Sequence, residues 1–245
     1  MTILLSVLVL LGATGTGPSA QEDRYAGPRA RMVAQIAAMA RETASVTGRP
    51  TLGEAVMSAM SRVPRHRFVP LIQERSAYED RALPIEEGQT ISQPFIVALM
   101  TDLVDPRREH TVLEVGTGSG YQAAVLAELV TKVYTIEIVE PLGRRAKRLL
   151  QELGYRNVEV RIGDGYNGWP EAAPFDSIVV TAAPPAIPQP LIDQLKPGGR
   201  MVIPTGRSHD VQFLLVVEKQ LDGTSTTRRT LPVRFVPLTR APATK

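Results

Sequence analysis

Residues 112–121 read Val-Leu-Glu-Val-Gly-Thr-Gly-Ser-Gly-Tyr, and this stretch decides the fold. Its first four residues are typical of a short buried strand, and its glycines let the backbone turn tightly and approach a ligand closely. The pattern Gly-x-Gly-x-Gly differs from the dinucleotide fingerprint Gly-x-Gly-x-x-Gly, because residue 121 is tyrosine. Taken alone, such a turn is also consistent with a purely structural role.

Strand and helix patterns alternate along the chain on the C-terminal side of this turn. Strands that alternate with helices predict a doubly wound, mainly parallel α/β sheet of the Rossmann-like kind. The last two strand patterns, at 211–218 and 226–236, follow each other across Asp222-Gly223 with no helix between them, which predicts an antiparallel hairpin at one edge. Before this hairpin we expect strands at 111–115, 132–138, 158–162, 175–181 and 200–204, and helices at 119–130, 140–153 and 188–195.

The residues before the core, 29–104, are expected to form a helical cap and a substrate loop. Apolar residues at helical spacing predict an amphipathic helix over 29–47. A second helix is expected after Thr51, which we place as its N-cap because Glu54, three residues later, completes a capping-box pattern. This helix is expected to end near Val63, since a proline follows.

Residues 70–92 are interpreted as a long polar loop, and loops of this length are often functional. Pro94 suits the first turn of a helix that runs to about Val104. Ser92 lies just before this helix and has two interpretations, which the residues alone leave equal. It could cap the helix, or its hydroxyl could act on a ligand held at the loop.

Residues 1–20 contain no Asp, Glu, Lys or Arg, and Ile3 to Leu11 is an apolar run. Small residues follow up to Ala20, a pattern typical of a signal peptide with its cleavage site. The run is too short to predict a transmembrane helix, so we expect no stable membrane span. Residues 21–245 are expected to form a single domain, with its core at 105–245.

The composition excludes several classes of function. The 245 residues include no cysteine, which rules out disulfides, thiolate metal sites and a cysteine nucleophile. The three histidines, His66, His110 and His209, belong to no ligand-spaced motif, so we expect no metal site. A net charge of +3, with 5% aromatic residues and no long basic run, predicts no nucleic-acid partner.

Acidic residues follow the second and third strands of the expected core sheet. Glu137 ends the second strand, where a carboxylate can accept both hydroxyls of a ribose, and Asp164 follows the third strand, where it can accept from an adenine amino group. In an open α/β sheet, ligands bind beyond the carboxyl ends of the strands, so these features predict an adenosine-containing ligand. S-adenosylmethionine (SAM) is favoured over NAD because it has no pyrophosphate to require the third glycine. Its sulfonium cation also tolerates nearby carboxylates such as Glu114.

Several further motifs are more distinctive than the glycine-rich turn. Residues 63–70 read Val-Pro-Arg-His-Arg-Phe-Val-Pro, and residues 88–94 read Gly-Gln-Thr-Ile-Ser-Gln-Pro. With them, the stretches at 112–121, 163–169, 175–185, 194–200 and 233–238 resemble motifs of the protein-L-isoaspartate O-methyltransferase family. The resemblance covers roughly residues 52–240. The chain departs from it in a longer link at 41–52 and in Phe95, where the family often has His or Tyr.

The resemblance implies a Rossmann-like SAM-methyltransferase fold and a reaction. The reaction is methylation of the α-carboxylate of L-isoaspartyl residues in peptides and proteins, whose ester cyclises to a succinimide that opens partly to normal aspartate. Ser92 is implied as the active-site residue, which favours its catalytic interpretation. The implied cofactor-binding residues are Gly116, Thr117, Gly118, Ser119, Gly120, Glu137, Asp164 and Gly165. The implied peptide-binding residues are Thr90, Ile91, Ser92, Val233, Phe235 and Val236.

This chemistry suits the residues that the chain offers. A carboxylate is already an anion at neutral pH, so it attacks a methyl group without a general base, and the sequence has no Ser-His-Asp or Cys-His set. Ser92 could donate one hydrogen bond that fixes which oxygen faces the methyl group. Backbone groups at 88–94 and 233–238 could pair with an extended peptide. The turn at 182–186, Ala-Ala-Pro-Pro-Ala, lacks the acceptor and ring that hold an amino group, which argues against adenine methylation.

Other functions remain open from the sequence. One is a SAM-dependent methyltransferase that acts on another carboxylate or on RNA. Another is a non-catalytic SAM-binding protein, although such a protein would not need the 88–94 loop, and a nicotinamide enzyme is disfavoured by Tyr121. Because SAM is made in the cytoplasm, we expect a cytoplasmic protein, or a periplasmic one if residues 1–20 act as a signal peptide.

Overall fold

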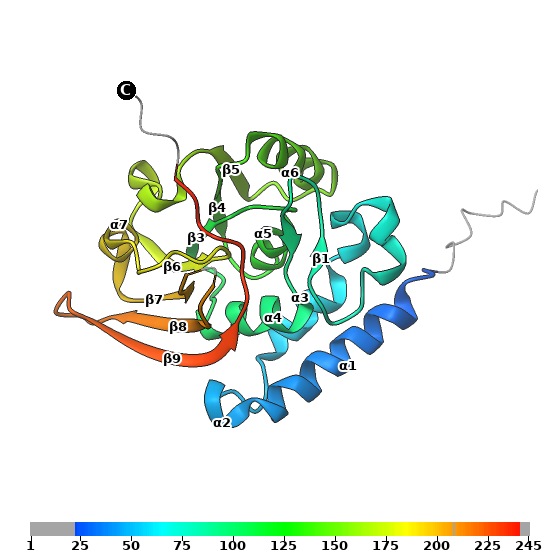
Figure 1. The fold of residues 1–245 in the computed structure, drawn as a ribbon, viewed down its shortest axis with the longest axis horizontal. Helices are drawn as coiled ribbons and strands as arrows, with labels where there is room; N and C mark the ends of the chain where they lie inside the picture. The colour runs from blue at the N-terminus through cyan, green and yellow to red at the C-terminus, as the bar shows by residue number, and fades with distance from the viewer. Residues whose placement is uncertain (1–22, 208, 241–245) are drawn as a thin grey trace, which may run out of the picture.

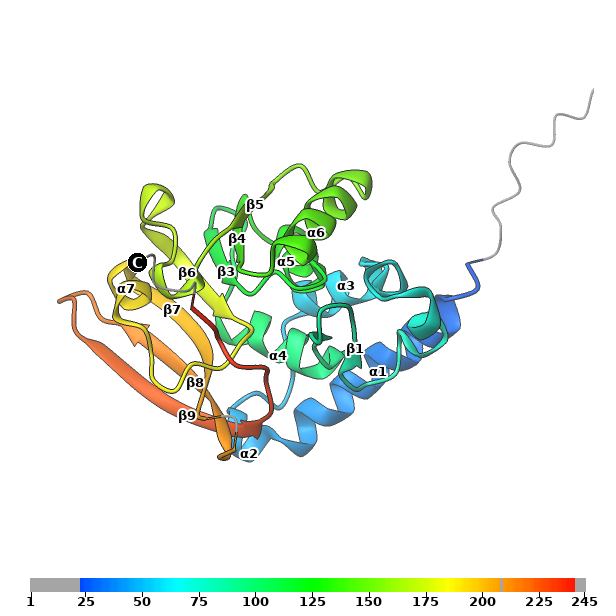
Figure 2. The same ribbon diagram turned by 45° about the horizontal axis from the view of Figure 1, so that its top comes forward.

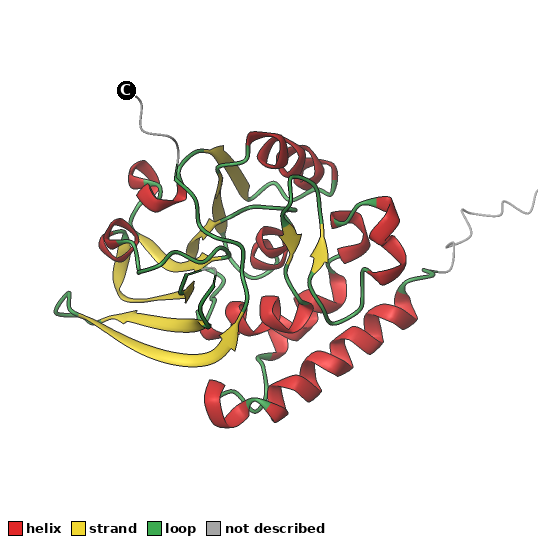
Figure 3. Cartoon of the chain, in the orientation of Figure 1, coloured by secondary structure: helices red, strands yellow, loops and turns green. Residues whose placement is uncertain are grey.

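A seven-stranded sheet with the order β5-β4-β3-β6-β7-β8-β9 lies at the centre of the computed structural model, which describes residues 23–207 and 209–240 (Figures 1 and 3). Strands β3 to β7 are parallel, and β8 and β9 add an antiparallel hairpin at one edge. The predicted fold class is therefore confirmed. The strands are β3 (Thr111–Val115), β4 (Lys132–Glu137), β5 (Val158–Ile162), β6 (Phe175–Val180), β7 (Leu195–Thr205), β8 (Gln212–Lys219) and β9 (Ser225–Val233).

Both faces of the parallel sheet are buried, as its apolar strands require. Neighbouring residues of β3 point to opposite faces: Val112 packs in the same cluster as apolar residues of α4, α5 and α6, whereas Leu113 packs with Leu191 of α7. These helices are α4 (Pro94–Leu103), α5 (Tyr121–Ala127), α6 (Glu140–Glu152) and α7 (Gln189–Asp193). Among the described residues, no helix is long and apolar enough to cross a membrane. The apolar segment 1–20 lies outside the described residues.

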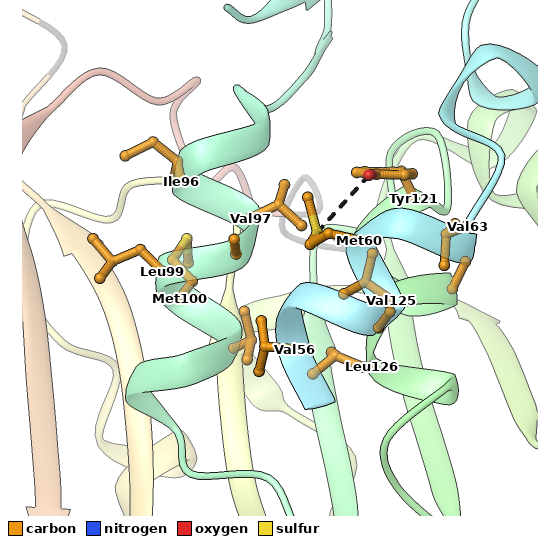
Figure 4. Close-up of a cluster of buried hydrophobic side chains, with 14 of the residues drawn as sticks. Val56, Met60, Val63, Ile96, Val97, Leu99, Met100, Tyr121, Val125 and Leu126 are labelled. Carbon is orange, nitrogen blue, oxygen red and sulfur yellow. Dashed lines mark hydrogen bonds between the residues drawn. The ribbon is translucent and has the colours of Figure 1, made fainter. Parts of the chain in front are cut away.

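The N-terminal helices pack on the α4–α5 side of the molecule. They are α1 (Ala26–Glu42), α2 (Ala44–Thr47) and α3 (Glu54–Arg62), and Figure 2 shows α1 running alongside the core. Figure 4 shows Val56 and Met60 of α3 packed between α4 and α5, close to Val97 and Val125. Fully burying such a side chain stabilises the fold by about 1.5–3 kcal/mol. This packing fixes α4 against the core. Helix α4 begins at the end of residues 88–94, which we call the substrate loop.

Two helix caps that the sequence suggested are wrong. Thr51 does not cap α3, whose N-cap is Gly53; the Gly53 N–H donates to Oδ1 of Asp102 at 2.6 Å. Ser92 is likewise not the N-cap of α4, which is Gln93; the helix N–H of Phe95 donates to Oδ1 of Asp80 at 2.8 Å. In both places a carboxylate from a distant part of the sequence satisfies the orphan donors of the first turn.

Other elements differ from the sequence-based expectations in their boundaries. The helix expected over 29–47 breaks at Thr43, whose hydroxyl donates to the Met39 carbonyl at 2.8 Å and competes with the helix. The polar loop at 70–92 contains a 3-10 helix, η2 (Leu71–Ser76), and a short hairpin of β1 (Leu83–Pro84) with β2 (Thr90–Ile91). Strand β7 starts at residue 195 instead of 200, with a register shift against β6. The remaining short 3-10 helices are η1 (Arg65–Phe68), η3 (Gly165–Asn167) and η4 (Pro170–Ala172).

Candidate active site

A cleft lies beyond the carboxyl ends of β3, β4 and β6, where the sequence predicted a ligand. We call it the sheet-edge cleft. Its floor and walls include the glycine-rich turn after β3, Glu137 at the end of β4, and residues after β5 and β6, together with part of the substrate loop and of the C-terminal segment. The lining residues on which the functional assignment depends are Gly116, Gly118, Glu137, Gly165, Thr181 and Thr90.

Two glycines at this cleft are required by close packing, because a Cβ at either position would clash with neighbouring protein atoms. Gly116 has φ +99°, and a Cβ there would lie 2.4 Å from Oγ1 of Thr181. A Cβ on Gly165 would lie 2.4 Å from Cγ1 of Val115. Gly118 differs: its φ is +50°, but the nearest atom to an added Cβ is Cδ1 of Ile85 at 4.0 Å. Gly116 and Gly165 therefore allow close packing inside the protein, whereas Gly118 is the one of these three positions with space for a side chain.

Glu137 links the glycine-rich turn to the end of β4. Its Oε2 accepts from the Gly118 N–H at 2.7 Å, and its Oε1 accepts from the Val139 N–H at 2.9 Å. Asp164 has a local role, because its Oδ1 accepts from the Tyr166 N–H at 2.9 Å and caps η3. Glu137 and Gly165 line the cleft. Asp164 is not among the lining residues, but it directly precedes Gly165 in the sequence.

The other residues of the glycine-rich turn face away from the sheet-edge cleft. The Thr117 hydroxyl is buried 2.7 Å from Oγ1 of Thr135. Ser119 lines two adjoining cavities. Gly120, with φ +88°, packs closely on Leu150 of α6. The structure therefore separates the predicted cofactor residues into those that line the cleft and those that shape the turn behind it.

A smaller inner cavity lies behind the cleft, between β3, α5 and the substrate loop, and Glu114 lines it. The carboxyl group is fully buried; Oε2 accepts from the Thr135 hydroxyl at 2.5 Å, and Oε1 has no partner among the described residues. Burial raises the pKa of Glu114 to about 8; the hydrogen bond from Thr135 opposes this shift and the nearby Glu137 carboxylate adds to it. Glu114 therefore takes up a proton more readily in the folded protein than in the unfolded chain.

Replacing this carboxyl group should change how stability depends on pH. A raised pKa in the folded state contributes stability at low pH that is lost as the pH rises toward about 8. The neutral variant Glu114→Gln does not lose this stability. The difference between its unfolding temperature and that of the unmodified protein should therefore shift in favour of the variant from pH 6 to pH 9. Thermal unfolding without added ligand measures the difference. The exposed control Glu109→Gln should show a constant difference, and a constant difference for Glu114→Gln would contradict the assignment.

The substrate loop brings Ser92 to the place where three hollows meet. A long groove runs between α4 and β9, and we call it the α4–β9 groove. Thr90 and Thr181 line the sheet-edge cleft, the inner cavity and this groove, while Ser92 lines the inner cavity and the groove. Ile91 is buried beside them and lines the inner cavity. Ser92 thus lies between the place where a cofactor would bind and the place where a peptide would bind.

Arg65 holds this loop in place, a role that the sequence reasoning missed. Its guanidinium is fully buried; Nη2 donates to the Ser92 carbonyl at 2.6 Å and Nε donates to the Ala77 carbonyl at 2.8 Å. It also lies over the Tyr121 ring, 4.7 Å from its centre. Burial lowers the pKa of Arg65 to about 10. The only sequence signal was its place in the 63–70 motif, because these contacts arise from the fold.

The C-terminal segment forms the opposite wall of the groove through Val233, Phe235 and Val236, as the resemblance implied. Strand β9, however, ends at Val233 and does not continue to residue 236. The amide of buried Gln212 takes over: Nε2 donates to the Phe235 carbonyl at 3.1 Å, and the Phe235 N–H donates to Oε1 at 2.6 Å. The Phe235 backbone is therefore already paired within the chain and is not available to an added peptide strand.

A doubly wound sheet with an antiparallel edge hairpin and a glycine-lined cleft at its carboxyl edge defines the class of Rossmann-like methyltransferases. The family model for protein-L-isoaspartate(D-aspartate) O-methyltransferase matches residues 47–243. The chain belongs to this family.

Individual relatives agree with this assignment. The chain is 62% identical over 208 residues to protein-L-isoaspartate O-methyltransferase 2 of Polaromonas sp. (strain JS666 / ATCC BAA-500), covering 85% of this chain and 99% of the relative. A solved protein-L-isoaspartate O-methyltransferase is 30% identical, with a TM-score of 0.73 over 85% of this chain and 65% of its own. A second solved structure, from Plasmodium falciparum, is a putative protein-L-isoaspartate O-methyltransferase in complex with S-adenosyl-L-homocysteine. It is 21% identical, with a TM-score of 0.72 over 90% of this chain and all of its own, and shares the fold.

Proposed function

We propose that this chain methylates the α-carboxylate of L-isoaspartyl residues in damaged peptides and proteins, using SAM as the methyl donor. The observation that carries the proposal is the position of Ser92, which lines both the α4–β9 groove and the inner cavity next to the sheet-edge cleft. Family membership supports the substrate class. Incorporation of labelled methyl groups from SAM into an isoaspartyl peptide, as a base-labile ester, tests it; a peptide that stays unlabelled would contradict it.

The sheet-edge cleft and the inner cavity fit SAM. Gly116, Gly118 and Gly165 line the cleft, and the carboxylate of Glu137 at the end of β4 suits a ribose. Glu114 lines the inner cavity next to this cleft, and its buried Oε1 has no partner among the described residues. Asp164 is proposed to recognise adenine beside Gly165. The relative that holds S-adenosyl-L-homocysteine supports this cofactor.

The chemistry needs alignment more than proton transfer. Bound SAM supplies a methyl group on a sulfonium; its C–S bond breaks as the carboxylate oxygen forms the new O–C bond, and a neutral thioether leaves. The carboxylate is already ionised at neutral pH, so the chain does not have to remove a proton. We propose that the Ser92 hydroxyl donates to one carboxylate oxygen and turns the other toward the donor. Arg65 keeps Ser92 in position through its carbonyl.

Removing the Ser92 hydroxyl should slow methyl transfer without weakening SAM binding. A hydrogen bond to a charged group contributes about 1.5–3 kcal/mol. Ser92→Ala should therefore lower kcat roughly 10- to 150-fold. The thermal stability should stay unchanged, because Asp80 caps α4. Steady-state kinetics measure the loss, with the exposed Ser61→Ala variant on α3 as the control. An unchanged kcat in Ser92→Ala would remove Ser92 from the reaction.

We further propose that the protein works in the cytoplasm, where SAM is made. No described helix could span a membrane, and the apolar segment at 1–20 is the reason to test the compartment. Cell fractionation followed by N-terminal sequencing should find a chain that keeps residues 1–20 in the cytoplasmic fraction. A mature chain that begins near Gln21 in a periplasmic fraction would overturn this proposal.

A further inference from the structure

The α4–β9 groove is much larger than an aspartyl side chain requires. Its volume is about 870 Å³, within the range of roughly 300–1,000 Å³ that is typical of clefts for drug-sized ligands. A substrate that fills it must therefore contribute more than the reacting residue. The groove is continuous with the Ser92 junction, so the additional volume faces the residues that flank the isoaspartate.

The two ends of the groove differ in chemistry. At its polar end lie Thr90, Ser92 and Thr181, three hydroxyl-bearing residues that also line the inner cavity. Away from this end, the wall is apolar and is built by Ile96 of α4 and Met39 of α1, with Leu231 and Val233 of β9 opposite. Among the described residues that line the groove, Arg234 is the one charged side chain, and it is exposed.

Ile96 and Met39 both line the groove, but they differ in exposure. Figure 4 shows Ile96 on the side of α4 away from Met60 and Tyr121, but its side chain is only 8% exposed and belongs to the main buried cluster. Met39 lies on α1, three residues beyond the fully buried Ile36, and is only partly buried. Apolar side chains that line an open groove gain free energy when another apolar group covers them.

We infer that the apolar part of the α4–β9 groove is a subsite for a large apolar side chain of the residue next to the isoaspartate. This inference rests on the proposed function and adds a preference among its substrates. The polar end receives the carboxylate, and the flanking side chain lies over Ile96 and Met39. A leucine at this position gains free energy when its side chain is buried. A glutamine of similar size gains less, because burying its amide costs desolvation free energy.

The preference should appear as a difference in kcat/KM between matched peptides. Leucine and glutamine are placed in turn on the amino-terminal and the carboxyl-terminal side of the same isoaspartate, with all other residues kept. A favourable difference of about 1.4 kcal/mol corresponds to a tenfold higher kcat/KM. We expect the leucine peptide to exceed the glutamine peptide by about tenfold on at least one side.

A charge placed in the subsite should abolish this preference. In Met39→Glu the leucine peptide should lose its advantage, and a lysine peptide should become the better substrate on the same side. The control Met39→Leu keeps the groove apolar at a small cost in packing and should keep the preference for leucine. Partial exposure of Met39 lets the charged variant fold, which circular dichroism and thermal unfolding verify.

The outcomes separate this inference from the proposed function. If the isoaspartyl peptides are methylated with equal kcat/KM whether leucine or glutamine stands on either side, the function stands and the subsite is refuted. If no isoaspartyl peptide is methylated, the proposed function itself fails. If the preference for leucine persists unchanged in Met39→Glu, the apolar contact lies elsewhere and this subsite is refuted.

Discussion

Gly118→Val should abolish SAM binding while the protein stays folded. Gly118 lines the sheet-edge cleft, and its N–H donates to Glu137. The atom nearest to an added Cβ is Cδ1 of Ile85 at 4.0 Å, so the new side chain extends into the space between the glycine-rich turn and Ile85 instead of into the core. The two methyl groups of valine would then occupy volume that the ligand needs. Isothermal titration calorimetry with SAM should show no measurable binding.

A matched variant separates this effect from backbone strain. The φ of Gly118 is +50°, which costs a non-glycine residue roughly 1–2 kcal/mol. Gly223 in the β8–β9 turn also has a positive φ, +86°, and an added Cβ there meets nothing within 4 Å. Gly223→Val should therefore carry similar strain and keep full SAM affinity. Unchanged affinity in a folded Gly118→Val protein would show that SAM binds elsewhere.

Gly116 would be a poorer test of the same site. An added Cβ there would lie 2.4 Å from Oγ1 of Thr181, whose hydroxyl donates to the Gly116 carbonyl at 2.6 Å. Even Gly116→Ala would disturb the contact between the ends of β3 and β6. A loss of binding could then come from a rearranged cleft. The contrast between these two glycines makes Gly118 the informative position.

The parallel core was predictable because local patterns determine it. Buried strands such as β3, predicted at 111–115 and found at Thr111–Val115, read as short, mainly apolar runs between turn residues. The glycine-rich turn and Glu137 fall at strand ends, and the topology of a parallel sheet brings those ends together on one edge. The position of the sheet-edge cleft could therefore be predicted from sequence spacing.

The substrate side depends on contacts that sequence spacing does not reveal. Asp102 and Asp80 cap helices that lie far from them in the sequence, so the local cap candidates Thr51 and Ser92 were wrong. Arg65 reaches Ser92 across 27 positions of sequence. These contacts join side chains to backbone groups that lie 15 to 49 positions away in the sequence. They could not be predicted from periodicity or from neighbouring residues.

The end of β9 also depends on a contact that sequence spacing does not reveal. A run of strand-like residues predicted a strand as far as residue 236, but the side chain of Gln212 replaces strand pairing at Phe235. A side-chain amide can form the same hydrogen bonds as a neighbouring strand. The sequence of the paired segment gives no indication that this happens. We therefore expect a peptide substrate to be held by residues 88–94 and by groove side chains rather than by pairing along this whole segment.

The enzyme should discriminate strongly between an isoaspartyl peptide and its aspartyl twin. In an isoaspartyl residue the main chain runs through the side-chain carbonyl, so the free α-carboxylate is attached directly to the α-carbon. In normal aspartate the free carboxylate is one methylene further from the main chain. A site that holds the main chain therefore presents the two carboxylates about 1.5 Å apart, one C–C bond length.

Methyl transfer is sensitive to such a displacement. Oxygen, carbon and sulfur must lie in line, and a misplacement near 1 Å can cost about 100-fold in rate. Thr90, Ser92 and Thr181 line the polar end of the groove, and this end is fixed by Arg65 and by the packing of α4. These residues therefore cannot move with a displaced carboxylate unless the hydrogen bonds of Arg65 break. We therefore expect the loss to appear mainly in kcat.

The most direct test of the central claim is kcat/KM for methyl transfer from labelled SAM to one isoaspartyl peptide and to its aspartyl twin of identical sequence. The structure predicts a ratio of about 100-fold or more in favour of the isoaspartyl peptide. Comparable kcat/KM values for the two peptides would contradict the claim and would indicate a general carboxyl methyltransferase.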